Sequence, residues 1–128
     1  MSEGASAKLA ILVWAADPES PHLCATPFYM AAAAAAMDAK VEMYFTARSV
    51  RLLETGVAER LTAAPGGAPL ADFLLQAHRL GVRLYACPTA LQAHGVPESR
   101  LRLEVAGQAG AAAFIGRTLD TAWRTLSF

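Results

Sequence analysis

The chain has 128 residues, of which 55% are hydrophobic, enough for one compact domain with a well-filled core. Eleven basic side chains balance eleven acidic ones, so no net charge attracts nucleic acid or an anionic membrane surface. Charged residues make up only 17%, which indicates apolar surface buried between the subunits of a homo-oligomer.

Two cysteines, neither in a Cys-x-x-Cys pair, are too few for a disulfide-built secreted scaffold. The apolar run from Lys8 to Trp14 has the length of a strand and lacks the cleavage site of an export signal. No stretch approaches the about 20 apolar residues of a membrane span. We therefore expect a protein of the reducing cytoplasm, with no contact to membranes.

In the first half of the chain the pattern predicts two strands and two helices. Leu9–Trp14 is a continuous apolar run, typical of a strand covered on both faces. Thr26-Pro27 has the form of an N-cap followed by proline and opens an alanine-rich helix that runs to Met37. Val41–Phe45 is the second predicted strand, and Arg48–Leu53 a short helix.

In the second half, Leu70–Leu80 has apolar residues at helical spacing and ends at Gly81. Val82–Ala86 is the third predicted strand, and Pro88–His94 a short helix stopped by glycine. Three further elements are expected after Pro97, namely a strand over 101–105, a helix over 107–118 and a strand over 122–128.

Alternating strands and helices predict an α/β protein, a three-layer α/β/α fold with a mostly parallel five-stranded sheet. Residues 1–7 are expected to be a flexible tail and residues 8–128 a single domain. Open parallel sheets bind ligands beyond the carboxyl ends of their strands. The segments expected at this edge are 17–24, 46–49, 87–89 and 107–110.

Cys87 is the first candidate for chemistry, because it stands where the third strand passes into a helix. Rigid backbone would hold its thiol at the edge of the sheet. Pro88 suits the first position of that helix, and free N–H groups near Thr89 would face the sulfur and stabilise a thiolate, the reactive form. The alternative is a packed thiol at a strand end, since cysteine is common in protein cores.

Cys24 precedes the alanine-rich helix and is expected near the same edge. If the first and third strands are close in the sheet, it is a candidate second or resolving thiol for Cys87. A residue packed beneath the loop is the favoured interpretation.

Further side chains near the expected edge are secondary candidates. Arg48 and Arg51 follow the second strand, close to Ser49, and would attract an anionic group, although an exposed helix face or a subunit contact is the favoured interpretation. His94 lies in the helix after Cys87, where a surface position is the more common role. His22, Cys24 and Cys87 do not form a closely spaced ligand cluster, so no metal is expected.

The sequence lacks the motifs of several function classes. Ala93 and Met30 stand where a cysteine phosphatase loop would carry arginine, and no Gly-x-x-x-x-Gly-Lys-Ser/Thr phosphate loop exists. Gly107-Gln108-Ala109-Gly110 matches half of a dinucleotide turn, but close packing of a helix on a sheet explains it equally.

The order and spacing of several segments resemble the DsrE/DsrF-like family of small sulfur-relay proteins over nearly the whole chain. The matching segments are the first strand followed by Ala25–Phe28, then 37–45, 49–53, 56–58, Gly81–Cys87 and the ending Asp120–Phe128.

The resemblance implies a parallel-sheet α/β/α fold, assembly as trimers or hexamers, and a persulfide carried on the cysteine that falls on Cys87. Implied partners are TusA-type sulfur carriers, rhodanese-like donors or heterodisulfide-reductase-like complexes, with no metal or organic cofactor. Cys24 is not part of the family pattern, so no role carries over to it.

Three hypotheses follow. The leading one is a sulfur-relay protein that transfers sulfane sulfur through Cys87 in sulfur oxidation or trafficking, closer to a carrier than to a turnover enzyme. The second is a non-catalytic oligomeric scaffold or small-ligand-binding module of the same fold. The third is a redox switch with a Cys24–Cys87 disulfide, which requires Cα atoms within about 7 Å.

Overall fold

The computed structural model describes residues 6–128 and contains one five-stranded sheet in the order β4-β3-β2-β1-β5. The strands are β1 (Lys8–Val13), β2 (Lys40–Phe45), β3 (Arg83–Ala86), β4 (Val105–Gln108) and β5 (Arg124–Ser127). All four strand pairings are parallel, so the predicted α/β fold is confirmed.

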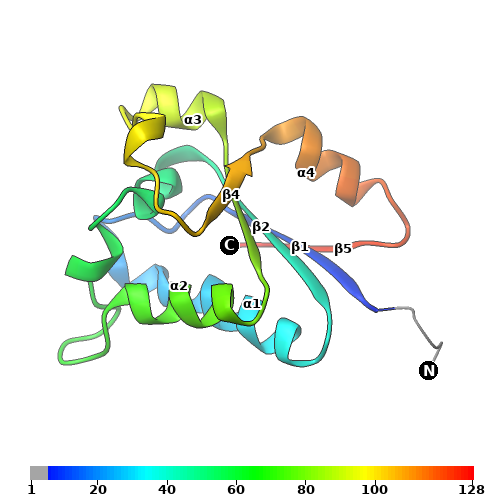
Figure 1. Ribbon diagram of the computed structural model, residues 1–128, viewed down its shortest axis with the longest axis horizontal. Coiled ribbons are helices and arrows are strands. Elements are labelled where there is room, and N and C mark those ends of the chain that lie inside the picture. The colour runs from blue at the N-terminus through cyan, green and yellow to red at the C-terminus, as the bar shows by residue number, and fades with distance from the viewer. Residues whose placement is uncertain (1–5) are drawn as a thin grey trace.

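The helices lie on both faces of this sheet (Figure 1). The α-helices are α1 (Ala25–Ala36), α2 (Leu70–Arg79), α3 (Pro88–Ala93) and α4 (Ala111–Thr118). The 3₁₀ helices are η1 (Pro21–Leu23), η2 (Ala47–Leu53), η3 (Ala58–Arg60) and η4 (Glu98–Arg100). Helices α1 and α2 pack side by side over one face, and α4 lies on the opposite face.

Side-chain alternation divides the strands between two cores of unequal size. On β3, Leu84 and Ala86 belong to the large core beneath α1 and α2, whereas Tyr85 packs in the small core beneath α4. Tyr44 of β2 is in the small core too. Because successive strand residues point to opposite faces, Cys87, the residue after Ala86, is directed to the α4 side.

Helix α1 begins two residues earlier than its sequence suggests. Cys24, not Thr26, is the N-cap, and Pro27 is the third helical residue. Proline is tolerated there because the first N–H groups of a helix have no partner within it. The alanines let α1 approach the sheet closely, and Ala31 and Ala32 are buried.

The region before α4 departs from the prediction. The strand expected at 101–105 is β4 at Val105–Gln108, and the helix expected from Gly107 starts at Ala111. The 101–104 segment instead crosses the end of η2, where the Arg102 N–H donates to the Leu53 carbonyl. The buried Arg102 side chain pairs with Glu59 and Glu104.

Of the expected tail, residues 1–5 lie outside the described residues. The Ala7 carbonyl accepts a hydrogen bond of 2.8 Å from the Lys40 N–H, which joins the chain to β2 just before β1 begins. No helix within residues 6–128 combines the length and the apolar character needed to cross a bilayer.

Candidate functional site

Cys87 is the N-cap of α3 and stands directly after β3, as the sequence predicts. Its N–H extends the sheet ladder by donating to the Phe45 carbonyl at 2.9 Å, and its carbonyl accepts from the Leu91 N–H at 2.9 Å. The backbone is therefore held by β2 on one side and by the first turn of α3 on the other. The side chain is half-buried.

Cys87 lines a pocket of about 190 Å³ at the carboxyl ends of the strands. The other lining residues come from strand ends and from α4, and they are Leu12, Tyr44, Phe45, Thr46, Ala109, Gly110, Ala111, Phe114 and Ile115. None of them carries a charge. An apolar cavity of about 150 Å³ holds benzene, so this pocket accommodates a group of several atoms next to the thiol.

Gly110, the N-cap of α4, lies against the sulfur of Cys87. A β-carbon at position 110 would stand 3.4 Å from Cys87 Sγ and 3.7 Å from Pro88 Cδ. The start of α4 is therefore a second helix terminus beside this sulfur, in addition to the start of α3. The Cys87 side chain makes no capping hydrogen bond at the start of α3, so the N–H contacts to the sulfur that the sequence predicted are not formed there.

Cys24 is fully buried at the end of the segment that joins β1 to α1. Its Sγ donates to the carbonyls of Asp17 at 3.3 Å and Ser20 at 3.5 Å. Burial, with a smaller contribution from the nearby Asp17 charge, raises the pKa of this thiol from 9.0 to about 11. This is the packed position that the sequence favoured.

The two thiols do not occupy one site. A second-thiol role for Cys24 depended on the first and third strands being close, but β2 lies between β1 and β3. Cys24 is buried inside the large core under α1. Cys87 packs against the edge of that core but lines the pocket on the α4 side. The arrangement gives no support to a Cys24–Cys87 disulfide.

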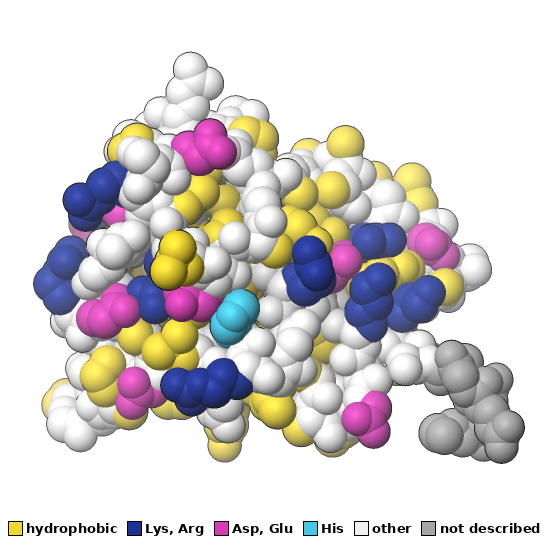
Figure 2. All heavy atoms as spheres, in the orientation of Figure 1, with side chains coloured by type: hydrophobic (Ala, Val, Ile, Leu, Met, Phe, Trp, Pro, Cys, Tyr) yellow, Lys and Arg dark blue, Asp and Glu magenta, His cyan; other side chains and the backbone are white. Residues whose placement is uncertain are grey.

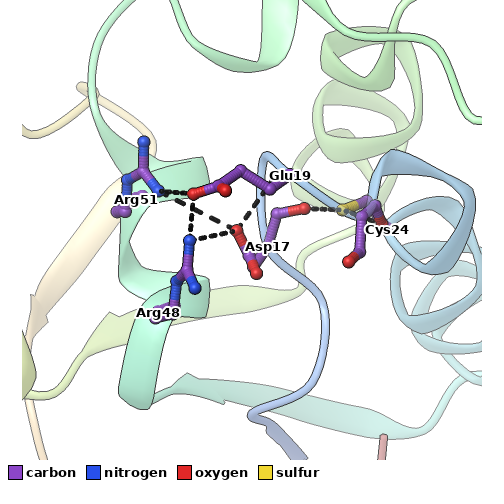
Figure 3. A network of polar contacts seen from close by, with 6 residues as sticks. Asp17, Glu19, Cys24, Arg48 and Arg51 are labelled. Carbon is purple, nitrogen blue, oxygen red and sulfur yellow. Dashed lines mark hydrogen bonds and ion pairs between the residues drawn. The ribbon is translucent and has the colours of Figure 1, made fainter.

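Arg48 and Ser49 follow β2 as expected but do not line the Cys87 pocket. Arg48 and Arg51 point toward Asp17 and Glu19 and form a network of four charges that closes over the loop after β1 (Figure 3). Ser49 is buried, and its hydroxyl lies 2.7 Å from the Val13 carbonyl and 2.6 Å from the Thr46 carbonyl. Both side chains secure the edge of the sheet structurally.

None of the three candidates on α3 lines the pocket. Pro88 and Thr89 directly follow Cys87 as the first two residues of the helix, whereas His94 is the exposed C-cap at the opposite end. Within residues 6–128, no group of three or more His, Cys, Asp or Glu side chains is arranged to hold a metal ion.

The sequence did not reveal the aromatic side of the pocket or the ion pair behind it. Tyr44 stacks on Tyr85 with ring centroids 5.3 Å apart and meets the edge of Phe114 at 5.7 Å. Behind Tyr44, the buried Glu42 pairs with Arg117 of α4. A glutamate inside the apolar run Val41–Phe45 was the available signal, because a buried carboxylate requires a partner.

A model of the DsrE/DsrF-like family matches residues 8–128. The chain belongs to the DsrE/DsrF-like family. The match covers every strand and helix described above. Family membership indicates a function of the general sulfur-relay type. No curated protein matches the chain in sequence.

Two solved structures share the DsrE-like fold. The ychN protein from E. coli has a TM-score of 0.74 at 15% identity, covering 94% of this chain and 99% of its own. MTH1491 from Methanobacterium thermoautotrophicum, described as a protein of unknown function, has a TM-score of 0.66 at 16% identity, covering 94% of this chain and 98% of its own. At these identities the similarity establishes the fold alone.

Proposed function

We propose that this DsrE/DsrF-like protein relays sulfur, carrying sulfane sulfur as a persulfide on Cys87 and exchanging it with partner sulfur carriers. The main support for this proposal is the contrast between the environments of its two thiols. Cys87 opens into an apolar pocket at the carboxyl edge of the sheet, whereas Cys24 is sealed in the core. A relay needs a thiol that another sulfur compound can reach.

The transfer is a thiol exchange that needs no outside oxidant. The Cys87 thiolate attacks the outer sulfur of a donor R–S–SH, a new S–S bond forms, and the donor S–S bond breaks. The donor leaves as the thiolate R–S⁻, and the proton stays on the transferred sulfur, now Cys87–S–SH. An acceptor thiolate removes that sulfur by the same step in reverse.

The pocket disfavours donors that carry a sulfonate group. Because its lining residues carry no charge, a sulfonate would lose hydration there without gaining a cationic partner. We therefore expect hydropersulfides R–S–SH to load Cys87 faster than thiosulfate does.

The proposed partners are proteins that present a thiol or a persulfide, namely a TusA-type carrier, a rhodanese-like donor or a heterodisulfide-reductase-like complex, in a reducing cytoplasm. Assembly into a trimer or hexamer is part of the proposal. Hydrophobic side chains gather around α4 on the surface (Figure 2), where Ile115 and Leu119 are 49% and 78% exposed. Such a surface is suited to burial between subunits.

Intact-mass measurement after incubation with inorganic polysulfide tests the proposal. The wild type and Cys24→Ser are expected to gain the mass of sulfur, and a reducing agent should remove it, while Cys87→Ser gains none. Equal loading of Cys87→Ser and wild type would contradict the assignment of Cys87. A wild type that takes up no sulfur from any donor would favour the scaffold alternative.

A further inference from the structure

Helix α4 forms one wall of the Cys87 pocket, yet none of its residues is fully buried. It covers the small core alone, and Ile115 on the pocket wall is half exposed. The position of this wall therefore depends on few contacts, in contrast to α1 and α2, which pack against each other and the sheet.

Two side chains attach α4 to the sheet. The ring of Phe114 meets Tyr44 edge-on, with centroids 5.7 Å apart. One turn further along, Arg117 donates from Nε to Glu42 Oε1 at 2.9 Å and from Nη2 to Glu42 Oε2 at 3.1 Å. Its guanidinium also lies 4.0 Å from the centre of the Trp123 ring. A two-pronged pair of this kind constrains direction as well as distance.

Glu42 links Arg117 of α4, the helix that forms the pocket wall, to Tyr44, which lines the pocket. It is only 3% exposed, and its Oε1 also accepts a hydrogen bond of 2.6 Å from the hydroxyl of Tyr44, which lines the pocket. Burial and the neighbouring Glu42 raise the pKa of Tyr44 to about 12, so its hydroxyl remains a donor at neutral pH. Because a buried carboxylate that loses its cation is strongly unfavourable, α4 is held where Arg117 reaches Glu42.

We propose that Glu42 and Arg117 are positioning residues that fix α4 against the sheet and so limit the size of the sulfur donor that reaches Cys87. The inference rests on the proposed function of Cys87. Neither side chain lines the pocket or contacts the thiol. They act through Tyr44 and α4, whose Phe114 and Ile115 border the space in front of the sulfur.

The test compares two thiol reagents of the same chemistry and different size, methyl and benzyl methanethiosulfonate, with peptide mapping to follow Cys87. The wild type should react faster with the methyl reagent. In Arg117→Met and in Glu42→Gln, the methyl-to-benzyl rate ratio should fall about tenfold, equivalent to about 1.4 kcal/mol. Arg79→Met, at the exposed end of α2, is the matched control and should keep the wild-type ratio.

Two further variants separate positioning from general destabilisation. Arg117→Lys keeps a positive charge near Glu42 but loses the planar two-pronged geometry, so a smaller change in the same direction is expected. The double variant Glu42→Gln with Arg117→Met leaves no unpaired carboxylate, yet α4 is still released. Its methyl-to-benzyl rate ratio should therefore stay as low as in the single variants. Recovery of the wild-type ratio in this double variant would overturn the inference.

Folded single variants that keep the wild-type ratio would also overturn it. If that happens while polysulfide still loads Cys87 of the wild type, only the positioning role is lost and the relay function stands. Failure of sulfur loading in the wild type is a separate outcome that removes the proposed function itself.

Discussion

Gly110 brings the start of α4 against the sulfur of Cys87, although the two residues belong to different strand–helix junctions. A β-carbon at position 110 would stand 3.4 Å from Sγ, in van der Waals contact, so a larger side chain would occupy the space beside the sulfur. The backbone of Gly110 has φ −123°, a value open to any residue, so its conformation does not require glycine. A sulfur atom added to Cys87 would require space in the same surroundings.

Gly110→Val should slow sulfur uptake by Cys87 about tenfold or more. A branched side chain would occupy the space beside Sγ and keep the donor's outer sulfur from the position that attack requires. The rate of mass gain with polysulfide measures this. Gly116→Ala is the control, since no atom lies within 4 Å of a β-carbon there, and it should keep the wild-type rate. Equal rates for Gly110→Val and wild type would show that this space is not used.

Cys24 should make folding stability depend on alkaline pH. Its thiol has a pKa of about 11 in the folded protein and 9.0 as its ordinary value, so the folded state holds the proton more tightly. The stabilisation is fully present below pH 9 and is lost as pH rises toward 11, at up to about 1.4 kcal/mol per pH unit.

Urea unfolding between pH 8 and pH 11 checks this dependence against Cys24→Ala. The variant should be less stable than the wild type at pH 8, and the difference should shrink as pH rises. Tyr44 ionises in both proteins at higher pH, so its contribution cancels in the difference. Two parallel stability curves would contradict the prediction.

Ser49→Ala should lower the free energy of unfolding by about 1 kcal/mol, the typical net value of a buried hydrogen bond. The Val13 and Thr46 carbonyls each keep a backbone donor, which limits the cost. Chemical denaturation measures the change, with the exposed Ser99→Ala as a control expected to have little effect. Sulfur loading of Cys87 should be unchanged, and a loss of loading would instead give Ser49 a role in the site.

Leu119→Glu should reduce the subunit count of the proposed oligomer, because a charge on the exposed apolar surface around α4 opposes burial between subunits. Native mass spectrometry or light scattering gives the subunit count. Met37→Glu, 81% exposed after α1, serves as the comparison and should leave the assembly intact. An unchanged count in Leu119→Glu would exclude this surface as the interface.

The strands and most helices were predictable because their signals are local. The continuous apolar runs of β1 and β2, the alanines of α1 and the helical spacing of Leu70–Leu80 each depend on neighbours in the chain. Gly81 also ends α2 as predicted, at a φ of 95° that glycine adopts without strain. The local pattern failed at Leu101–Val105, where the Arg102 N–H donates to the Leu53 carbonyl and its side chain pairs with Glu59, both in distant parts of the sequence.

The candidate site shows the same division. The order Ala86-Cys87-Pro88 by itself determined that a thiol stands between a buried strand and a helix. Only the tertiary structure decided that β2 separates β1 from β3, that Cys24 is sealed while Cys87 opens into a pocket, and that α4 forms the wall. Strand order and the packing of α4 arise from contacts between residues far apart in the sequence, and no local periodicity encodes those contacts.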